Sequence, residues 1–158
     1  MSEIAWTSRQ LGVLAWEAGD SEKAEKLLRE SIRLLAPMRE RGTLCESQRY
    51  LAQLLLEQGR VDEAEKFALA ARETVSPEDT VSRATTRVAL AQVRAAQNRD
   101  TEAEELFRQA VDIVTGAEHC RIGFDVLPAY AEFLRSRGRD EEADELDQRL
   151  ADFAPTAA

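Results

Sequence analysis

The sequence predicts an all-α fold, an α-solenoid of four helix-turn-helix repeats with eight antiparallel helices. Two observations carry this prediction. Short segments that end one helix and start the next recur at a nearly constant interval, and apolar residues follow each segment at helical spacing. The four segments share an alanine in the same register: Ala24, Ala64, Ala103 and Ala143.

Each segment is typical of a tight turn between two helices. Five positions before each alanine stands a residue that tolerates a left-handed backbone: Gly19, Gly59, Asn98 and Gly138. Ser21, Asp100 and Asp140 stand where an N-cap is expected, and acidic residues follow in the next turn, where the helix dipole favours negative charge.

The second helix of each repeat, here called the B helix, carries a stripe of small and apolar residues. The stripe positions lie on one helical face: Leu27, Leu28, Ser31 and Leu35 in repeat one, Phe67, Ala68, Ala71 and Val75 in repeat two, and Leu106, Phe107, Ala110 and Val114 in repeat three. In repeat four Asp147 replaces an apolar stripe residue, which is typical of a terminal repeat with a polar outer face.

The first helix of each repeat, the A helix, has a stripe of its own that we expect in the core. Its members are Leu11, Leu14, Ala15 and Ala18, then Leu51, Leu54 and Leu55, then Leu90 and Val93, and finally Tyr130, Phe133 and Leu134. Arg94 also falls on this stripe. We expect its buried guanidinium to pair with a carboxylate between repeats, with a ligand anchor as the alternative.

The repeats span approximately 3–38, 43–78, 80–116 and 121–154, and we expect them to form a single domain over 1–158. The A helix of repeat four is the least regular, because Gly123 and Pro128 lie near its start. A start near residue 126, capped by Asp125, leaves a preceding loop of about ten residues.

Composition narrows the possible functions. The chain has 44% hydrophobic and 32% charged residues, as ordinary globular proteins do. A net charge of −9 disfavours nucleic acid and anionic membranes as partners. The sequence shows neither a secretory signal nor an apolar run of about 20 residues, and two cysteines do not make a disulfide framework, so we expect a cytoplasmic protein.

Catalytic and metal-binding patterns are missing from the sequence. His119 adjoins Cys120, but no further ligand stands at metal-like spacing, and nothing marks Cys120 or Cys45 as an activated thiol. No phosphate-binding loop is present. We therefore predict no enzymatic activity, no cofactor and no metal site.

The repeats resemble the tetratricopeptide repeat family, whose pattern is W-x2-L-G-x2-Y, then A-x3-F, then P. The matching residues are Leu11-Gly12, Ala15, Ala24, Leu28 and Pro37 in repeat one, Pro77 in repeat two, and Ala103 and Phe107 in repeat three. The signature Trp and Tyr are absent at these positions, and the repeats are longer than the usual length of about 34 residues. In repeat length the chain resembles the long-period repeats of kinesin light chains and large bacterial regulators more than those of the short chaperone cofactors.

The resemblance implies a right-handed superhelix whose A helices line a concave groove that holds a peptide or protein segment. Trp and Arg, which are enriched at binding hot spots, occur among the positions expected to face this groove. These candidate partner-binding residues are Trp6, Arg9, Val13, Trp16, Arg49, Gln53, Leu56, Val88, Gln92 and Arg135.

Charge suggests the kind of ligand. The A helices hold 8 basic and 6 acidic residues, whereas the B helices hold 11 basic and 20 acidic residues. A mildly basic groove favours an acidic ligand segment, although the acidic outer surface can serve solubility alone.

Two other functions stay open. The Trp6 and Trp16 face, or an open end of the solenoid, can pair with a second copy to give a homodimer. The tryptophans can instead pack within the solenoid or meet a preceding repeat. The chain can also be a ligand-sensing domain of a larger bacterial signalling protein.

Overall fold

The computed structural model describes residues 2–38, 40–115 and 123–153. Contacts divide the chain into two compact units, Met1–Ser82 and Arg83–Ala158, and each unit is described by itself. That the two units form a single domain over 1–158 stays a prediction.

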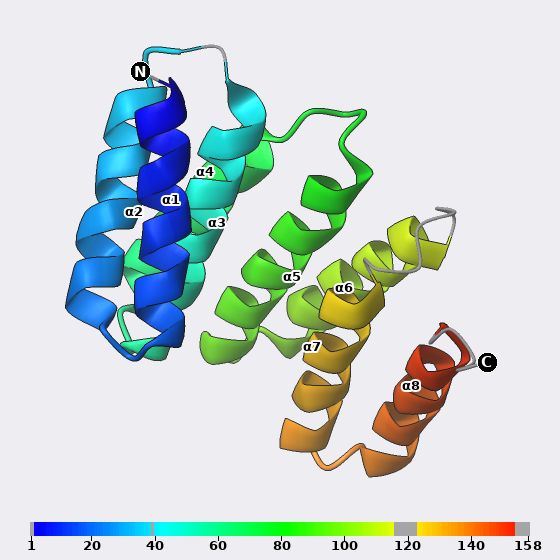
Figure 1. Cartoon of the computed structure of the whole chain (residues 1–158). Coiled ribbons are helices and arrows are strands. Elements are labelled where there is room, and N and C mark those ends of the chain that lie inside the picture. Colours follow the sequence, from blue (N-terminus) through cyan, green and yellow to red (C-terminus); the bar gives the residue numbers. More distant parts are fainter. Residues whose placement is uncertain (1, 39, 116–122, 154–158) are drawn as a thin grey trace. The chain divides into compact units, whose positions relative to one another are not determined.

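The described residues form eight helices and no strand, which confirms the all-α prediction (Figure 1). The helices are α1 (Ser2–Glu17), α2 (Ser21–Leu35), α3 (Arg41–Glu57), α4 (Val61–Thr74), α5 (Thr80–Ala96), α6 (Asp100–Thr115), α7 (Gly123–Ser136) and α8 (Asp140–Phe153). They alternate as the A and B helices of four repeats.

In the first unit each helix packs against the next, α1 on α2, α2 on α3 and α3 on α4 (Figure 1). α1 approaches α2 closely at Gly12, where an added Cβ atom would lie 3.1 Å from Leu28 Cγ. Fully buried leucines fill this unit: Leu28, Leu35, Leu51, Leu54 and Leu55.

In the second unit aromatic residues join α6 to α7. Phe107 of α6 stacks on Tyr130 of α7 at 5.1 Å between ring centroids, and its ring lies 5.3 Å from that of Phe133. These three side chains belong to one core cluster with residues of α5 and α8. The B helix α6 therefore covers the A helix that follows it.

The predicted left-handed turn residues are confirmed. Gly19, Gly59 and Gly138 have positive φ, and Asn98 has φ 58°. The predicted N-caps are wrong by one residue. Each helix begins two residues after the left-handed residue, so the cap is the residue between them. Asp20, and not Ser21, caps α2: its carboxylate accepts a hydrogen bond from Lys23 N at 3.1 Å. Asp100 and Asp140 are the first helical residues of α6 and α8.

The last A helix starts earlier than residue 126. α7 begins at Gly123, so Asp125 lies in its first turn and does not cap it. Pro128 lies inside the helix, in the second turn, where it removes one backbone hydrogen bond. Residues 116–122 of the expected loop lie outside the described part of the chain.

The core stripes of the A helices are confirmed in repeats two to four, but in repeat one only Ala15 of the predicted stripe is buried. Leu11 and Leu14 are 48% and 58% exposed, and Ala18 is exposed too. α1 instead packs on α2 through a small-residue face made of Ala5, Ser8, Gly12 and Ala15. In repeat four the preceding B helix α6 covers the positions equivalent to Leu11 and Leu14, which are Tyr130 and Phe133.

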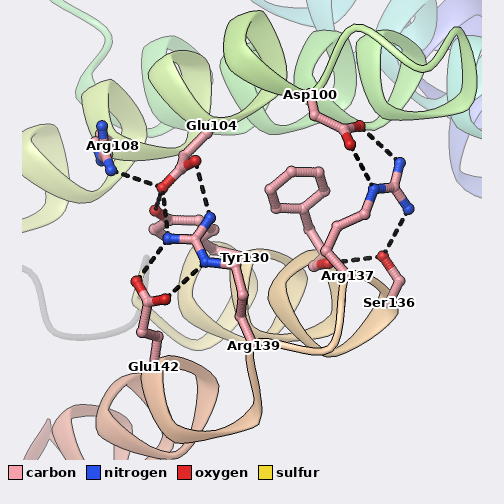
Figure 2. Close-up of polar contacts among 9 residues, drawn as sticks. Asp100, Glu104, Arg108, Tyr130, Ser136, Arg137, Arg139 and Glu142 are labelled. Atoms are coloured by element: carbon pink, nitrogen blue, oxygen red, sulfur yellow. Dashed lines mark hydrogen bonds and ion pairs between the residues drawn. The ribbon is translucent and has the colours of Figure 1, made fainter.

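Arginines at the turns connect consecutive repeats within each unit. Arg60, which follows Gly59, donates hydrogen bonds to Glu25 of α2 and to Glu63 of its own helix. Arg139, which follows Gly138, does the same with Glu104 of α6 and with Glu142 (Figure 2). The residue after the turn glycine thus reaches back to the B helix of the preceding repeat.

Candidate functional site

Two adjoining open pockets lie on the A helices of the first unit and share Trp6 and Thr43. One, of about 490 Å³, is lined by Glu3, Trp6, Thr7, Glu40 and Thr43. The other, of about 350 Å³, is lined by Trp6, Arg9, Gly42, Thr43, Glu46, Asp79, Val81 and Ser82. Trp6 is 51% exposed and stands between them, so a bound segment would contact its indole ring.

The predicted residue Arg9 lines the second pocket but is already paired. Its guanidinium lies 3.1 Å from a carboxylate oxygen of Glu46 on α3, and its side chain is largely buried. Arg49 lies 3.5 Å from the other oxygen of Glu46 and donates a hydrogen bond to Gln53. Glu46 therefore neutralises part of the basic charge that the A helices were expected to offer.

Trp16 lies away from the pockets and connects α1 to α3. Its indole N–H donates a hydrogen bond of 2.7 Å to Glu57, and its ring meets Tyr50 edge-on at 6.4 Å. The guanidinium of Arg49 lies 4.0 Å from the centre of the Tyr50 ring. Val13, Gln53 and Leu56 are half-buried. Of the predicted α1 residues, only Trp6 and Arg9 line the pockets.

The three predicted site residues of the second unit differ in accessibility. Val88 is buried in the core cluster of that unit, so its side chain does not face solvent. Gln92 is half-buried. Arg135 is exposed but forms ion pairs with Asp144 and Asp147 of α8.

Arg94 has the carboxylate partner that its burial requires. Its Nε lies 3.5 Å from Glu102, and it donates a hydrogen bond of 2.7 Å to Gln97. Glu102 belongs to the same repeat, whereas we expected a partner between repeats. A carboxylate partner supports the structural interpretation of this residue, and the alternative of a ligand anchor stays a prediction.

The described cysteine is not activated. Burial, followed by the charge of Glu46, raises the pKa of Cys45 to about 12, and its thiol donates to the carbonyl of Ala71. A thiol with this pKa stays protonated at neutral pH and is a poor nucleophile. His119 and Cys120 lie outside the described residues. Within 2–38, 40–115 and 123–153, no three His, Cys, Asp or Glu side chains gather as metal ligands would.

Sequence reasoning missed most of the acidic lining of the pockets. Glu46 stands 40 residues after Trp6, in the same register of the next A helix, so the repeat pattern could have identified it. Glu40 and Asp79 precede the first residues of α3 and α5, and no periodic pattern marks them. Their position depends on how consecutive A helices pack.

Taken together, the helix pairs define a helical-repeat protein with two open pockets on the A helices of its first unit. Residues 43–115 match the tetratricopeptide repeat family, which confirms the resemblance found in the sequence. The matched residues extend from α3 to α6. No curated protein matches the chain.

Two solved structures share the fold. One is a Podosopora anserina protein described as a kinesin light chain with nearly identical TPR-like repeats, with 23% identity and a TM-score of 0.67 over 96% of this chain and 75% of that chain. The other is a variant of the same protein, with 24% identity and a TM-score of 0.63 over 96% and 76% of the two chains. Tetratricopeptide repeats generally mediate protein–protein interactions. No described helix is long and apolar enough to cross a membrane.

Proposed function

We propose that the chain is a protein-interaction module that holds a peptide or protein segment on the A helices of its first unit, at the pockets on either side of Trp6. The observation that supports this is the half-exposed indole, shared by two open pockets. A large aromatic side chain at the centre of a concave surface is the residue type that dominates binding energy at interfaces. Other candidate residues, Val88, Gln92 and Arg135 among them, remain predictions.

The predicted acidic ligand segment gains no support at these pockets. Their lining includes the carboxylates of Glu3, Glu40, Glu46 and Asp79, and its one described base, Arg9, is paired with Glu46. We propose instead that apolar contact with Trp6 and Val81, and not charge, anchors the segment.

The experiment is selection of binding peptides from a random library displayed against the full chain, followed by fluorescence anisotropy on the selected peptides. Trp6→Ala should weaken binding at least about tenfold, because an aromatic hot spot is lost. Glu17→Ala is the control, since Glu17 lies on the same helix, is exposed and lies outside both pockets. Equal effects of both variants, or no selected peptide, would overturn the proposal.

A homodimer through the Trp6 and Trp16 face, and a ligand-sensing role in a larger protein, stay predictions. Sedimentation equilibrium of the wild type and of the double variant Trp6→Ala/Trp16→Ala, compared with the 17.7 kDa monomer, tests the homodimer. A dimer that the double variant abolishes would assign this face to self-association and remove the support for a foreign segment there.

A further inference from the structure

α1 carries an exposed, mostly apolar stripe that shares only Thr7 with the pockets described above. Its members follow a spacing of three and four residues, as in one seam of a coiled coil: Ile4, Thr7, Leu11, Leu14 and Ala18. Ile4, Leu11 and Leu14 are among the exposed large apolar residues of the chain. A contiguous apolar stripe of this kind marks an interaction surface.

The second unit shows what covers the same positions elsewhere. Tyr130 and Phe133 of α7 stand in the register of Leu11 and Leu14, and they are only 7% and 6% exposed. Phe107 of the preceding B helix α6 packs against both rings. The register therefore specifies a helix as the covering element, with one large apolar side chain over the pair Leu11 and Leu14.

Charge at the turn distinguishes the first repeat from the others. Glu104 stands three residues before Phe107 and receives two hydrogen bonds from the turn residue Arg139 (Figure 2). Glu25 stands three residues before Leu28 and receives two hydrogen bonds from the turn residue Arg60. In repeat one the equivalent turn residue is Asp20, which is exposed. A covering helix with an acid at this position would therefore meet a like charge.

We propose that the α1 stripe docks an amphipathic helix of another protein, with a Lys or Arg three residues before a Phe or Leu. The large apolar residue packs on Leu11 and Leu14, as Phe107 packs on Tyr130 and Phe133. The base of the docked helix pairs with Asp20 at the turn. In the Glu104–Arg139 pair the charges are the other way round, with the acid on the covering helix and the base at the turn. The contact residues Leu11 and Leu14 lie outside both Trp6 pockets, so the proposal does not depend on the function proposed for those pockets.

The chain's own B helices do not fit this description. At the position of the base they carry acids: Glu25, Glu65, Glu104 and Asp144. The exposed face of α8 would also place Asp147 over Leu11 and Leu14, because Asp147 stands in the register of Phe107. An antiparallel pair of α1 helices would bring Glu3 near Glu17 of the second copy, which repels. Charge therefore disfavours a second copy as the occupant.

The test uses stapled peptides with the sequence of α6, residues 100–115, and the full chain. One peptide keeps Glu104 and Phe107, one carries Glu104→Lys, and one carries Glu104→Lys with Phe107→Ala. A staple between positions 101 and 105, both exposed in the protein, holds the short peptides helical. Calorimetry measures the affinity of each for the wild type and for Asp20→Arg, a substitution that places at this turn the residue found at the equivalent turns.

We expect the Glu104→Lys peptide to bind the wild type about fivefold more tightly than the Glu104 peptide, since one attractive pair replaces one repulsive pair. With the Asp20→Arg protein, the Glu104 peptide should bind more tightly than the Glu104→Lys peptide. With Glu22→Arg, which makes the same charge change at an exposed neighbouring site, the Glu104→Lys peptide should still bind more tightly. Phe107→Ala in the peptide, or Leu11→Ala/Leu14→Ala in the protein, should abolish binding.

Three results would overturn the proposal. The first is that neither the Glu104 nor the Glu104→Lys peptide binds the wild type, or that both bind it equally well. The preference can survive Asp20→Arg. Sedimentation can reveal a dimer of the wild type that Leu11→Ala/Leu14→Ala dissociates, in which case a second copy covers the stripe.

Discussion

The guanidinium of Arg139 makes two parallel hydrogen bonds to the carboxylate of Glu104, 2.9 and 3.0 Å long, across 35 residues of sequence (Figure 2). Arg60 contacts Glu25 at the same sequence separation in the first unit, through one guanidinium nitrogen where Arg139 uses two. Paired donors of this kind are stronger and more directional than a single ion pair. Glu104 also accepts from Tyr130 and Arg108, so one carboxylate joins α6, α7 and the turn before α8.

Replacing Glu104 should therefore weaken the second unit. We expect Glu104→Gln to lower the free energy of unfolding by about 1–3 kcal/mol, because charge-assisted hydrogen bonds are lost at a largely buried group. Urea unfolding monitored by circular dichroism measures it. Glu105→Gln, at an exposed neighbour, is the control and should change stability by less than about 0.5 kcal/mol. Equal losses of stability in the two variants would show that the hydrogen bonds of Glu104 do not stabilise the second unit.

Acid should destabilise the protein through the same carboxylates. The hydrogen bond from Arg139 lowers the pKa of Glu104, and that from Arg137 lowers the pKa of Asp100. For Glu25, burial alone would raise the pKa, but hydrogen bonds from Arg60 and Arg29 outweigh it and lower the pKa.

A carboxyl group with a lowered pKa binds fewer protons in the folded state than in the unfolded state, so its stabilisation is present above the unfolded pKa and is lost on acidification. We expect the free energy of unfolding to fall as the pH drops from about 5 to about 3, around the ordinary values of Glu and Asp. Urea titrations at several pH values measure this slope. Glu104→Gln should flatten it, and a slope unchanged in this variant would contradict the assignment.

The two leucines Leu14 and Leu54 occupy the same register in repeats one and two but differ in burial. Leu54→Ala should cost about 2–5 kcal/mol, because it opens a cavity in a fully buried site. Leu14→Ala should cost less than about 1 kcal/mol, because the side chain is already largely in water. Thermal unfolding of both variants at matched concentration is the measurement. A large cost at Leu14 would mean that the stripe is covered in solution.

Asn98 is the one described residue other than glycine with a positive φ. Asn98→Gly should keep or raise stability, whereas Asn98→Ala should lower it by about 1 kcal/mol, since a Cβ without a compensating polar group disfavours this backbone region. Differential scanning calorimetry compares the two variants. Identical midpoints would indicate that the turn relaxes to another conformation.

Local signals in the sequence were sufficient for the fold. The left-handed positions Gly19, Gly59, Asn98 and Gly138 and the buried B-helix alanines follow from backbone geometry and from period, both of which depend on near neighbours. The N-caps were displaced by one residue, because Asp20 and Ser21 are both good caps and only the hydrogen bond to Lys23 decides between them.

The candidate site depended on contacts that no period reveals. Leu11 and Leu14 have the same pattern as Leu51 and Leu54, yet the first two are exposed and the other two are fully buried. Arg9 was expected to face a ligand, but its charge is balanced by Glu46, 37 residues away. Trp6 and Trp16 share one side of α1, but only Trp16 lies close enough to Glu57 to donate a hydrogen bond to it.

The turn arginines limit how such repeats can be shuffled to engineer new arrays. Arg60 and Arg139 each connect two helices, so a repeat transplanted behind α2 or α6 must bring both the arginine and the acid three positions later that orients it. The contact has a fixed order along the chain. The acid lies on the B helix of the earlier repeat, and the arginine lies at the turn of the later repeat. A chimaera that places repeat one after another repeat would oppose Asp20 to an acid, and its junction would require a compensating charge swap.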